Sequence, residues 1–148
     1  MPPSSSSLLF SCGRVPLNRS ELRQFATRLR DEVANGRAFT CLVTRDAELR
    51  RLNLQFLGHD YPTDVLSFPT GARDGALGEM AISVDRAAAQ AEEHGHGVDD
   101  EIRILMLHGV LHLTGMDHVG DGGRMRRVET RWRKTFGLPA GLIERARA

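Results

Sequence analysis

The chain has 148 residues, of which 41% are hydrophobic and 26% are charged. This length is typical of one domain and the apolar content suffices for a buried core, which excludes an intrinsically disordered chain. No apolar run approaches the roughly 20 residues that a membrane helix needs, and residues 1–10 lack the basic and apolar segments of a secretory signal. We therefore expect a cytoplasmic protein that makes no contact with a membrane.

The net charge of +1 hides an uneven distribution along the chain. Residues 1–37 carry a net charge of +3, residues 38–120 carry −7 and residues 121–148 carry +5. A basic C-terminal stretch beside an acidic middle suits an anionic partner held near a cation, although solvated helix faces give the same pattern. Cys12 and Cys41 lie in separate apolar stretches, so we expect buried thiols rather than a metal or redox pair.

The first 83 residues predict four strands and two amphipathic helices, which follow a Ser-rich leader. In chain order we expect a strand at 8–11, a helix from Ser20 to Asn35-Gly36, a strand at 39–44, a helix capped by Asp46, and strands at 65–68 and 77–83. We expect residues 71–75 to join the last two strands as a hairpin.

The rest of the chain predicts helices. An Ala-rich helix is expected at 84–94, and a helix at 101–114 is apolar over most of its circumference and therefore buried. In the last helix, at about 122–136, an apolar stripe opposes a row of basic residues. We expect one α+β domain over residues 1–148, with a small mixed sheet of about four strands packed against about five helices, a short flexible leader and a C-terminal tail.

Three of the six histidines fall within residues 108–118. His108 and His112 are four residues apart in a predicted helix, so both imidazoles project from one face, at the spacing with which two side chains bind one metal ion. Gly115 ends the helix, and a sharp turn there brings His118 back to the same ion as a third ligand. The three histidines therefore predict a metal site with one coordination position left open.

Three protein ligands with an open position are typical of catalytic zinc sites, whereas structural zinc sites have four protein ligands. Zinc lowers the pKa of its bound water to ~7, so this metal-bound water is the expected nucleophile of a hydrolysis reaction. We expect one Zn²⁺ per chain, although imidazole ligands also suit nickel, copper or iron.

The spacing of the three histidines is that of the metzincin proteases, but Gly109 stands where those proteases have the Glu that acts as general base. This departure argues against a protease. Asp117 is the nearest acid and is a candidate catalytic residue; alternatively, it orients His118 or caps the turn. We interpret His94 and His96 as part of a solvated helix end rather than as a second metal site.

Three segments taken together resemble the bacterial YbeY family of metal-dependent endoribonucleases. They are residues 52–69, residues 77–83, and residues 108–118 followed by Met125 and Glu129. The block His-Gly-x-Leu-His-Leu-x-Gly-x-Asp-His at 108–118 is highly specific, and the block Pro-Thr-Asp-Val-Leu-Ser-Phe-Pro at 62–69 is nearly as specific. The resemblance spans about residues 49–130 of the chain.

The resemblance implies a zinc site formed by His108, His112 and His118, in a single metal-dependent hydrolase domain without a nucleotide cofactor. It implies single-stranded RNA as the substrate. It also implies a role in ribosome quality control and in maturation of the 3′ end of 16S ribosomal RNA, with the small ribosomal subunit as the partner.

Two further groups of residues are expected to contact the RNA. Polar residues of the 62–69 block are expected to line the pocket, and these are Thr63, Asp64 and Ser67. Basic residues of the last helix are expected to bind the RNA backbone, and these are Arg124, Arg127 and Arg131.

One position departs from the family pattern. Members of the family usually carry an Arg a few residues after the Leu-Asn pair, and here that position is Leu57. An Arg there would hold a phosphate or stabilise developing negative charge, and His59, Arg50 and Arg51 are the candidates to replace it. The departure leaves a second function open, a ribosome-assembly factor that binds RNA, has a largely structural metal and cuts little RNA itself.

Overall fold

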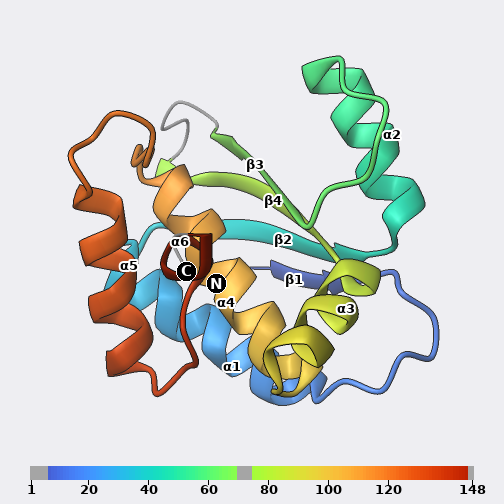
Figure 1. Cartoon of the computed structure of the whole chain (residues 1–148), viewed down its shortest axis with the longest axis horizontal. Coiled ribbons are helices and arrows are strands. Elements are labelled where there is room, and N and C mark those ends of the chain that lie inside the picture. Colours follow the sequence, from blue (N-terminus) through green and yellow to red (C-terminus); the bar gives the residue numbers. More distant parts are fainter. Residues whose placement is uncertain (1–6, 70–74, 147–148) are drawn as a thin grey trace.

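The computed structural model of the chain describes residues 7–69 and 75–146. Four strands form one mixed sheet in the order β1-β2-β4-β3 (Figure 1). They are β1 (Ser7–Phe10), β2 (Phe39–Thr44), β3 (Val65–Pro69) and β4 (Gly78–Ser83). β1, β2 and β4 run parallel to one another, and β3 runs antiparallel to β4. The predicted four-stranded mixed sheet is confirmed, while most of the predicted turn at 71–75 lies outside the described residues.

Six α-helices and one π-helical segment complete the described part of the chain. They are α1 (Arg19–Arg28), η1 (Leu29–Val33), α2 (Asp46–Leu57), α3 (Val84–His94), α4 (Val98–Leu113), α5 (Arg124–Thr135) and α6 (Leu142–Ala146). The predicted α+β class is confirmed, and only the short α6 has no counterpart in the prediction. None of the described helices has the length and hydropathy needed to cross a bilayer.

The sheet separates a larger core from a smaller one. Figure 1 shows α1 and α4 over one face of the sheet and α2 over the other face. Met80 and Ile82 of β4 belong to the larger core, whereas Ala81 between them packs in the smaller core with Leu49 and Leu66. This alternation is the period of two expected for a strand that is buried on both faces.

α4 packs tightly against the sheet at Gly109. A Cβ atom at this position would lie 2.8 Å from the Met80 sulfur and 3.2 Å from the Ser67 hydroxyl oxygen. The Ser67 hydroxyl also donates a hydrogen bond to the Gly109 carbonyl at 3.2 Å, which ties β3 to α4. Close packing of α4 on the sheet therefore explains why no larger residue, such as the metzincin Glu, stands here.

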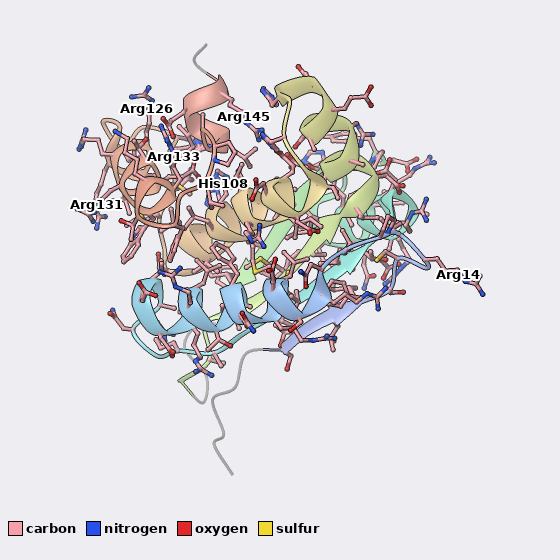
Figure 2. All side chains as sticks on the ribbon, turned by 90° about the horizontal axis from the view of Figure 1, so that it is seen from below. Arg14, His108, Arg126, Arg131, Arg133 and Arg145 are labelled. Carbon is pink, nitrogen blue, oxygen red and sulfur yellow. The ribbon has the colours of Figure 1, made fainter. Side chains whose placement is uncertain are left out.

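Two ion pairs hold α6 against the rest of the molecule, and Figure 2 labels their arginines, Arg133 and Arg145. Arg145 donates hydrogen bonds at 2.8 and 2.9 Å to Glu101, which is fully buried in α4. Arg133 of α5 donates hydrogen bonds at 2.9 and 3.0 Å to Glu144. His96 Nε2 lies 2.6 Å from Glu101 Oε1 and its side chain is only 10% exposed, so the prediction of a solvated residue is wrong for His96, whereas His94 at the end of α3 is exposed as predicted.

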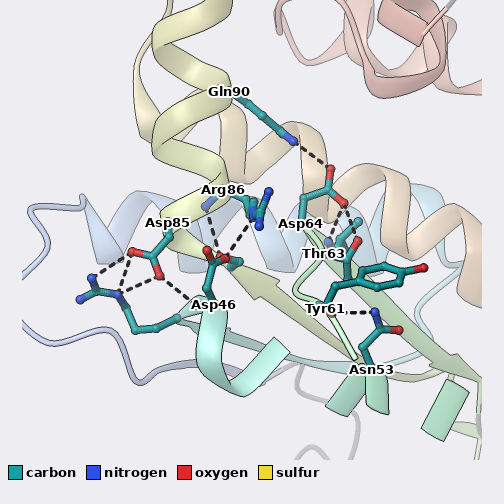
Figure 3. A network of polar contacts seen from close by, with 11 residues as sticks. Asp46, Asn53, Tyr61, Thr63, Asp64, Asp85, Arg86 and Gln90 are labelled. Carbon is teal, nitrogen blue, oxygen red and sulfur yellow. Dashed lines mark hydrogen bonds and ion pairs between the residues drawn. The ribbon is translucent and has the colours of Figure 1, made fainter. Parts of the chain in front are cut away.

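The residues predicted to cap two helices also differ from those in the structure, and α4 begins at Val98 rather than at residue 101. Asn18, rather than Ser20, caps α1, because its side chain accepts a hydrogen bond from the Glu21 amide at 3.2 Å. Asp46 is the first residue of α2 rather than its cap, and its amide donates to the Asp85 carboxylate of α3 at 2.8 Å (Figure 3). A neighbouring helix thus supplies the acceptor for α2, a tertiary contact that local sequence does not reveal.

The ion pair between Arg133 and Glu144 makes the stability of the folded protein depend on pH. The hydrogen bond from Arg133 lowers the pKa of Glu144 from 4.5 to about 2. Because folding depresses this pKa, the pair stabilises the protein fully above about pH 5 and loses its effect as the pH falls towards 2. We expect Glu144→Gln to lower the Tm at pH 7, with a difference from wild type that shrinks between about pH 5 and 3. Thermal denaturation followed by circular dichroism measures this, and a difference independent of pH would contradict it.

Candidate metal centre

The structure brings the side chains of His108, His112 and His118 together. One ring nitrogen of each histidine can serve as a ligand atom, and these nitrogens all lie within 4.8 Å of one another. α4 carries the first two histidines, and the chain then turns at Gly115, whose φ of 102° favours glycine, so that His118 returns to the cluster. The result is a set of three nitrogen atoms around one point.

A buried carboxylate fixes the His108 ring. His108 Nδ1 lies 2.7 Å from Glu129 Oε2, and the Glu129 side chain is 1% exposed. The other oxygen of Glu129 accepts a hydrogen bond from the Ile143 amide at 3.0 Å. The sequence held a signal for this role, since Glu129 lies four residues after Met125 and so on the buried face of α5, where an acid needs a partner.

His112 is oriented in the same way by a backbone carbonyl. Its Nδ1 donates a hydrogen bond to the Met116 carbonyl at 2.8 Å. With both Nδ1 atoms acting as donors, the Nε2 atoms of His108 and His112 both point into the cluster, where they lie 3.0 Å apart. Two unprotonated nitrogens this close would repel each other, so a cation bound between them fits the donor set.

The electrostatics of the cluster favour the neutral form of His112. Burial and the nearby His108 ring lower the pKa of His112, although the hydrogen bond to Met116 opposes this shift. The neutral ring is therefore the dominant form at neutral pH. It is also the form of histidine that coordinates transition metals.

Two cavities adjoin the histidine cluster. The first, of about 400 Å³, is lined by Asp64, His108, His118, Asp121, Gly123, Arg126, Leu142 and Ile143. The second, of about 540 Å³, is lined by Leu57, Asp64, Val65, Leu66, Ser67, Pro69, His108, His112, Gly115, Met116, Asp117 and Leu142. Because both include His108, Asp64 and Leu142, the cavities meet beside the candidate metal position.

Two of the three predicted pocket residues line the cavities beside the cluster, and the third does not. Asp64 lines both cavities and Ser67 lines the second. Asp64 accepts hydrogen bonds from the Val65 amide at 2.8 Å and from Gln90 Nε2 at 3.2 Å (Figure 3). Thr63 lines neither cavity, and its hydroxyl lies 3.5 Å from Asp64 Oδ1.

Two acidic residues shape the turn around His118. Asp117 is exposed, and its Oδ1 accepts a hydrogen bond from the Val119 amide at 3.0 Å, which is the geometry of a turn cap. Asp121 was not singled out from the sequence; it accepts hydrogen bonds from the Met125 and Gly123 amides, each at 2.9 Å. These bonds, with that of Met125 the strongest, lower the pKa of Asp121 and fix the start of α5.

The arginines predicted to bind RNA lie outside the two cavities. Arg124 and Arg131 line a separate cavity of about 420 Å³ between α5 and the end of α4. Arg127 is exposed, and its Nη1 donates to the Gly122 carbonyl at 3.0 Å. By contrast, Arg126, one residue earlier, lines the first cavity.

Leu57 lines the second cavity and is 54% exposed. The residues expected to replace the family Arg at this position have other contacts. Arg50 pairs with Asp60 at 2.7 Å, and Arg51 pairs with Glu48 at 2.7 Å. The third candidate, His59, stacks on Tyr61, with ring centroids 5.3 Å apart.

The chain is similar to known proteins both in sequence and in fold. The family model described as endoribonuclease YbeY matches residues 15–137. Endoribonuclease YbeY of Solibacter usitatus is 55% identical over 146 residues, which cover 99% of this chain and 98% of that protein. Endoribonuclease YbeY of Nautilia profundicola is 45% identical over 131 residues, or 86% of this chain and 94% of that protein. A Thermotoga maritima protein with a solution structure has a similar fold, with a TM-score of 0.61 and 24% identity over 88% of this chain and 89% of that protein.

The contact between His108 and Glu129 predicts that the affinity of the site for metal depends on the Glu129 carboxylate. Glu129→Gln keeps the size of the side chain but removes its charge, so we expect the affinity for Zn²⁺ to fall about 10–100-fold. Competition with a chromophoric chelator measures this affinity. Glu92→Gln changes an exposed glutamate of α3 in the same way and serves as the matched control. Equal Zn²⁺ affinity in Glu129→Gln and wild type would contradict the assigned role.

Proposed function

The chain belongs to the endoribonuclease YbeY family, and from this premise we propose that it is a metal-dependent endoribonuclease that cuts single-stranded RNA. The single observation that carries the proposal is the set of three histidine nitrogens within 4.8 Å of one another, beside cavities open to a substrate. Three imidazoles leave a position for a reacting group, which is the arrangement of a hydrolytic metal site.

The proposed cofactor is one Zn²⁺ per chain held by His108, His112 and His118, and another divalent transition metal would suit the same nitrogens. Such an ion lowers the pKa of a water molecule and polarises a phosphoryl oxygen, and it thereby supplies the chemistry of phosphodiester hydrolysis. Glu129 holds the His108 ring in place throughout. Asp117 acts by keeping the turn that carries His118 in shape.

The polar wall of the cavities is proposed to receive the RNA. Asp64 and Ser67 form part of this wall, and Thr63 supports Asp64 from outside it. The basic side of α5 then extends the contact along the RNA backbone, through Arg124, Arg127 and Arg131. Contacts of this kind position an RNA strand without reading its sequence.

The proposed biological setting is the cytoplasm, where the enzyme would act with the small ribosomal subunit on the 3′ end of 16S ribosomal RNA and in ribosome quality control.

One observation favours the alternative function. Leu57 occupies the cavity wall where the resemblance predicts an Arg, and a site without that cation is weaker in binding phosphate. The alternative is an RNA-binding assembly factor whose metal is mainly structural.

Removal of one histidine separates the two functions. His118 is exposed, so His118→Ala should leave the core intact while the metal content falls below one ion per chain. We expect cleavage of a labelled single-stranded RNA to disappear together with the metal, because the ion supplies the hydrolytic chemistry. His94→Ala, at the exposed end of α3, is the control. Metal analysis by mass spectrometry and gel assays with a chelator provide the readouts, and cleavage that survives loss of the metal would contradict the proposal.

Restoring the family cation gives a second test. Leu57→Arg places a guanidinium on the wall of the second cavity, and we expect kcat/KM for single-stranded RNA to rise about tenfold or more through stabilisation of developing negative charge. Leu54→Arg adds the same charge at an exposed position of α2 and controls for non-specific attraction. If both variants raised kcat/KM equally, position 57 would have no special role in the site.

A further inference from the structure

Arg126 reaches the candidate site from α5. It lines the same cavity as His108 and His118, and the cavity of about 400 Å³ has room for a phosphate and part of a nucleotide. Figure 2 shows Arg126 on the side of the molecule where α6 lies. Among the described residues that line the two cavities at the cluster, Arg126 is the only Arg or Lys.

The guanidinium of Arg126 does not hold the fold together. Its Nε is buried and has no hydrogen-bond partner, and no ion pair forms on this side chain within residues 7–69 and 75–146. The neighbouring Arg133 and Arg145, in contrast, are paired with Glu144 and Glu101. The Arg126 guanidinium is therefore available to bind an anion in the cavity.

The two carboxylates of the cavity are already committed to other donors. Asp121 accepts hydrogen bonds from two backbone amides at the start of α5, each at 2.9 Å. Asp64 accepts from the Val65 amide at 2.8 Å and from Gln90 at 3.2 Å. The Arg126 guanidinium donates to neither carboxylate and is therefore available to bind the negative charge of a phosphodiester.

We infer that Arg126 binds a phosphate of the RNA backbone in the cavity beside the histidine cluster and thereby takes over the role that the absent Arg at position 57 would have had. The inference rests on the proposed endoribonuclease function and names the residue that grips its substrate. A planar guanidinium suits this role, since it donates two parallel hydrogen bonds to phosphate oxygens. It acts from α5 in the first cavity, whereas Leu57 lines the second cavity.

The test compares two variants that each remove one positive charge. Arg126→Ala removes the cavity arginine, and Arg14→Ala removes an exposed arginine at the other edge of the molecule (Figure 2). The probe is a 5′-labelled single-stranded RNA, bound to metal-free protein in the presence of a chelator so that it is not cut. For Arg126→Ala we expect an affinity about ten- to a hundredfold lower and a salt-dependence slope smaller by about one. Arg14→Ala should change the affinity by about twofold or less.

Stability and metal content separate binding from a structural role. Because Nε of Arg126 has no partner, Arg126→Ala should keep or raise the Tm and should retain the wild-type metal content. Arg126→Lys keeps the charge but not the planar fork, so its RNA affinity should lie between those of wild type and Arg126→Ala.

Three results would overturn the inference: wild-type RNA affinity in Arg126→Ala, an equal loss in Arg14→Ala, or a lowered Tm that accounts for the lost affinity. Failure of the proposed function gives a different pattern. If the wild type binds RNA through Arg126 but does not cut it when loaded with Zn²⁺, the inference stands and the nuclease function fails.

Discussion

The buried hydrogen bond between His108 and Glu129 is the contact on which the candidate site depends. It joins the Nδ1 atom of a proposed metal ligand to a carboxylate that is 1% exposed, at 2.7 Å. The same carboxylate accepts the amide of Ile143, at the start of α6. One side chain therefore sets the orientation of the His108 ring, the position of α5 and the wall of the cavity that α6 provides.

A cation at the cluster would offset the unfavourable burial of the Glu129 carboxylate and the close approach of two imidazole nitrogens. A buried carboxylate such as Glu129 needs a positive or strongly polar partner, and a neutral imidazole is only a modest one. The Nε2 atoms of His108 and His112 face each other at 3.0 Å, with both Nδ1 atoms used as donors. A metal ion bound by these nitrogens would polarise the His108 ring and so strengthen its bond to Glu129. The proposed metal and the buried acid would thus stabilise each other.

Local patterns predicted the strands, the five longer helices and the grouping of the three histidines, because each depends on residues close together in the chain. Contacts between distant elements could not be predicted in this way. The buried partner of His108 comes from α5, the acceptor at the start of α2 comes from α3, and α6 is held by ion pairs to α4 and α5. The basic face of α5 was also evident in the sequence, but not that Arg126, rather than Arg124, Arg127 or Arg131, enters the cavity at the histidines.

X-ray absorption spectroscopy of the zinc-loaded protein tests the central claim most directly, because it reports the number and kind of atoms bound to the metal. The account predicts three imidazole nitrogens at about 2.0–2.1 Å and one further light atom at the open position. Sulfur ligands at about 2.3 Å, or a shell of oxygen ligands with no imidazole, would contradict it.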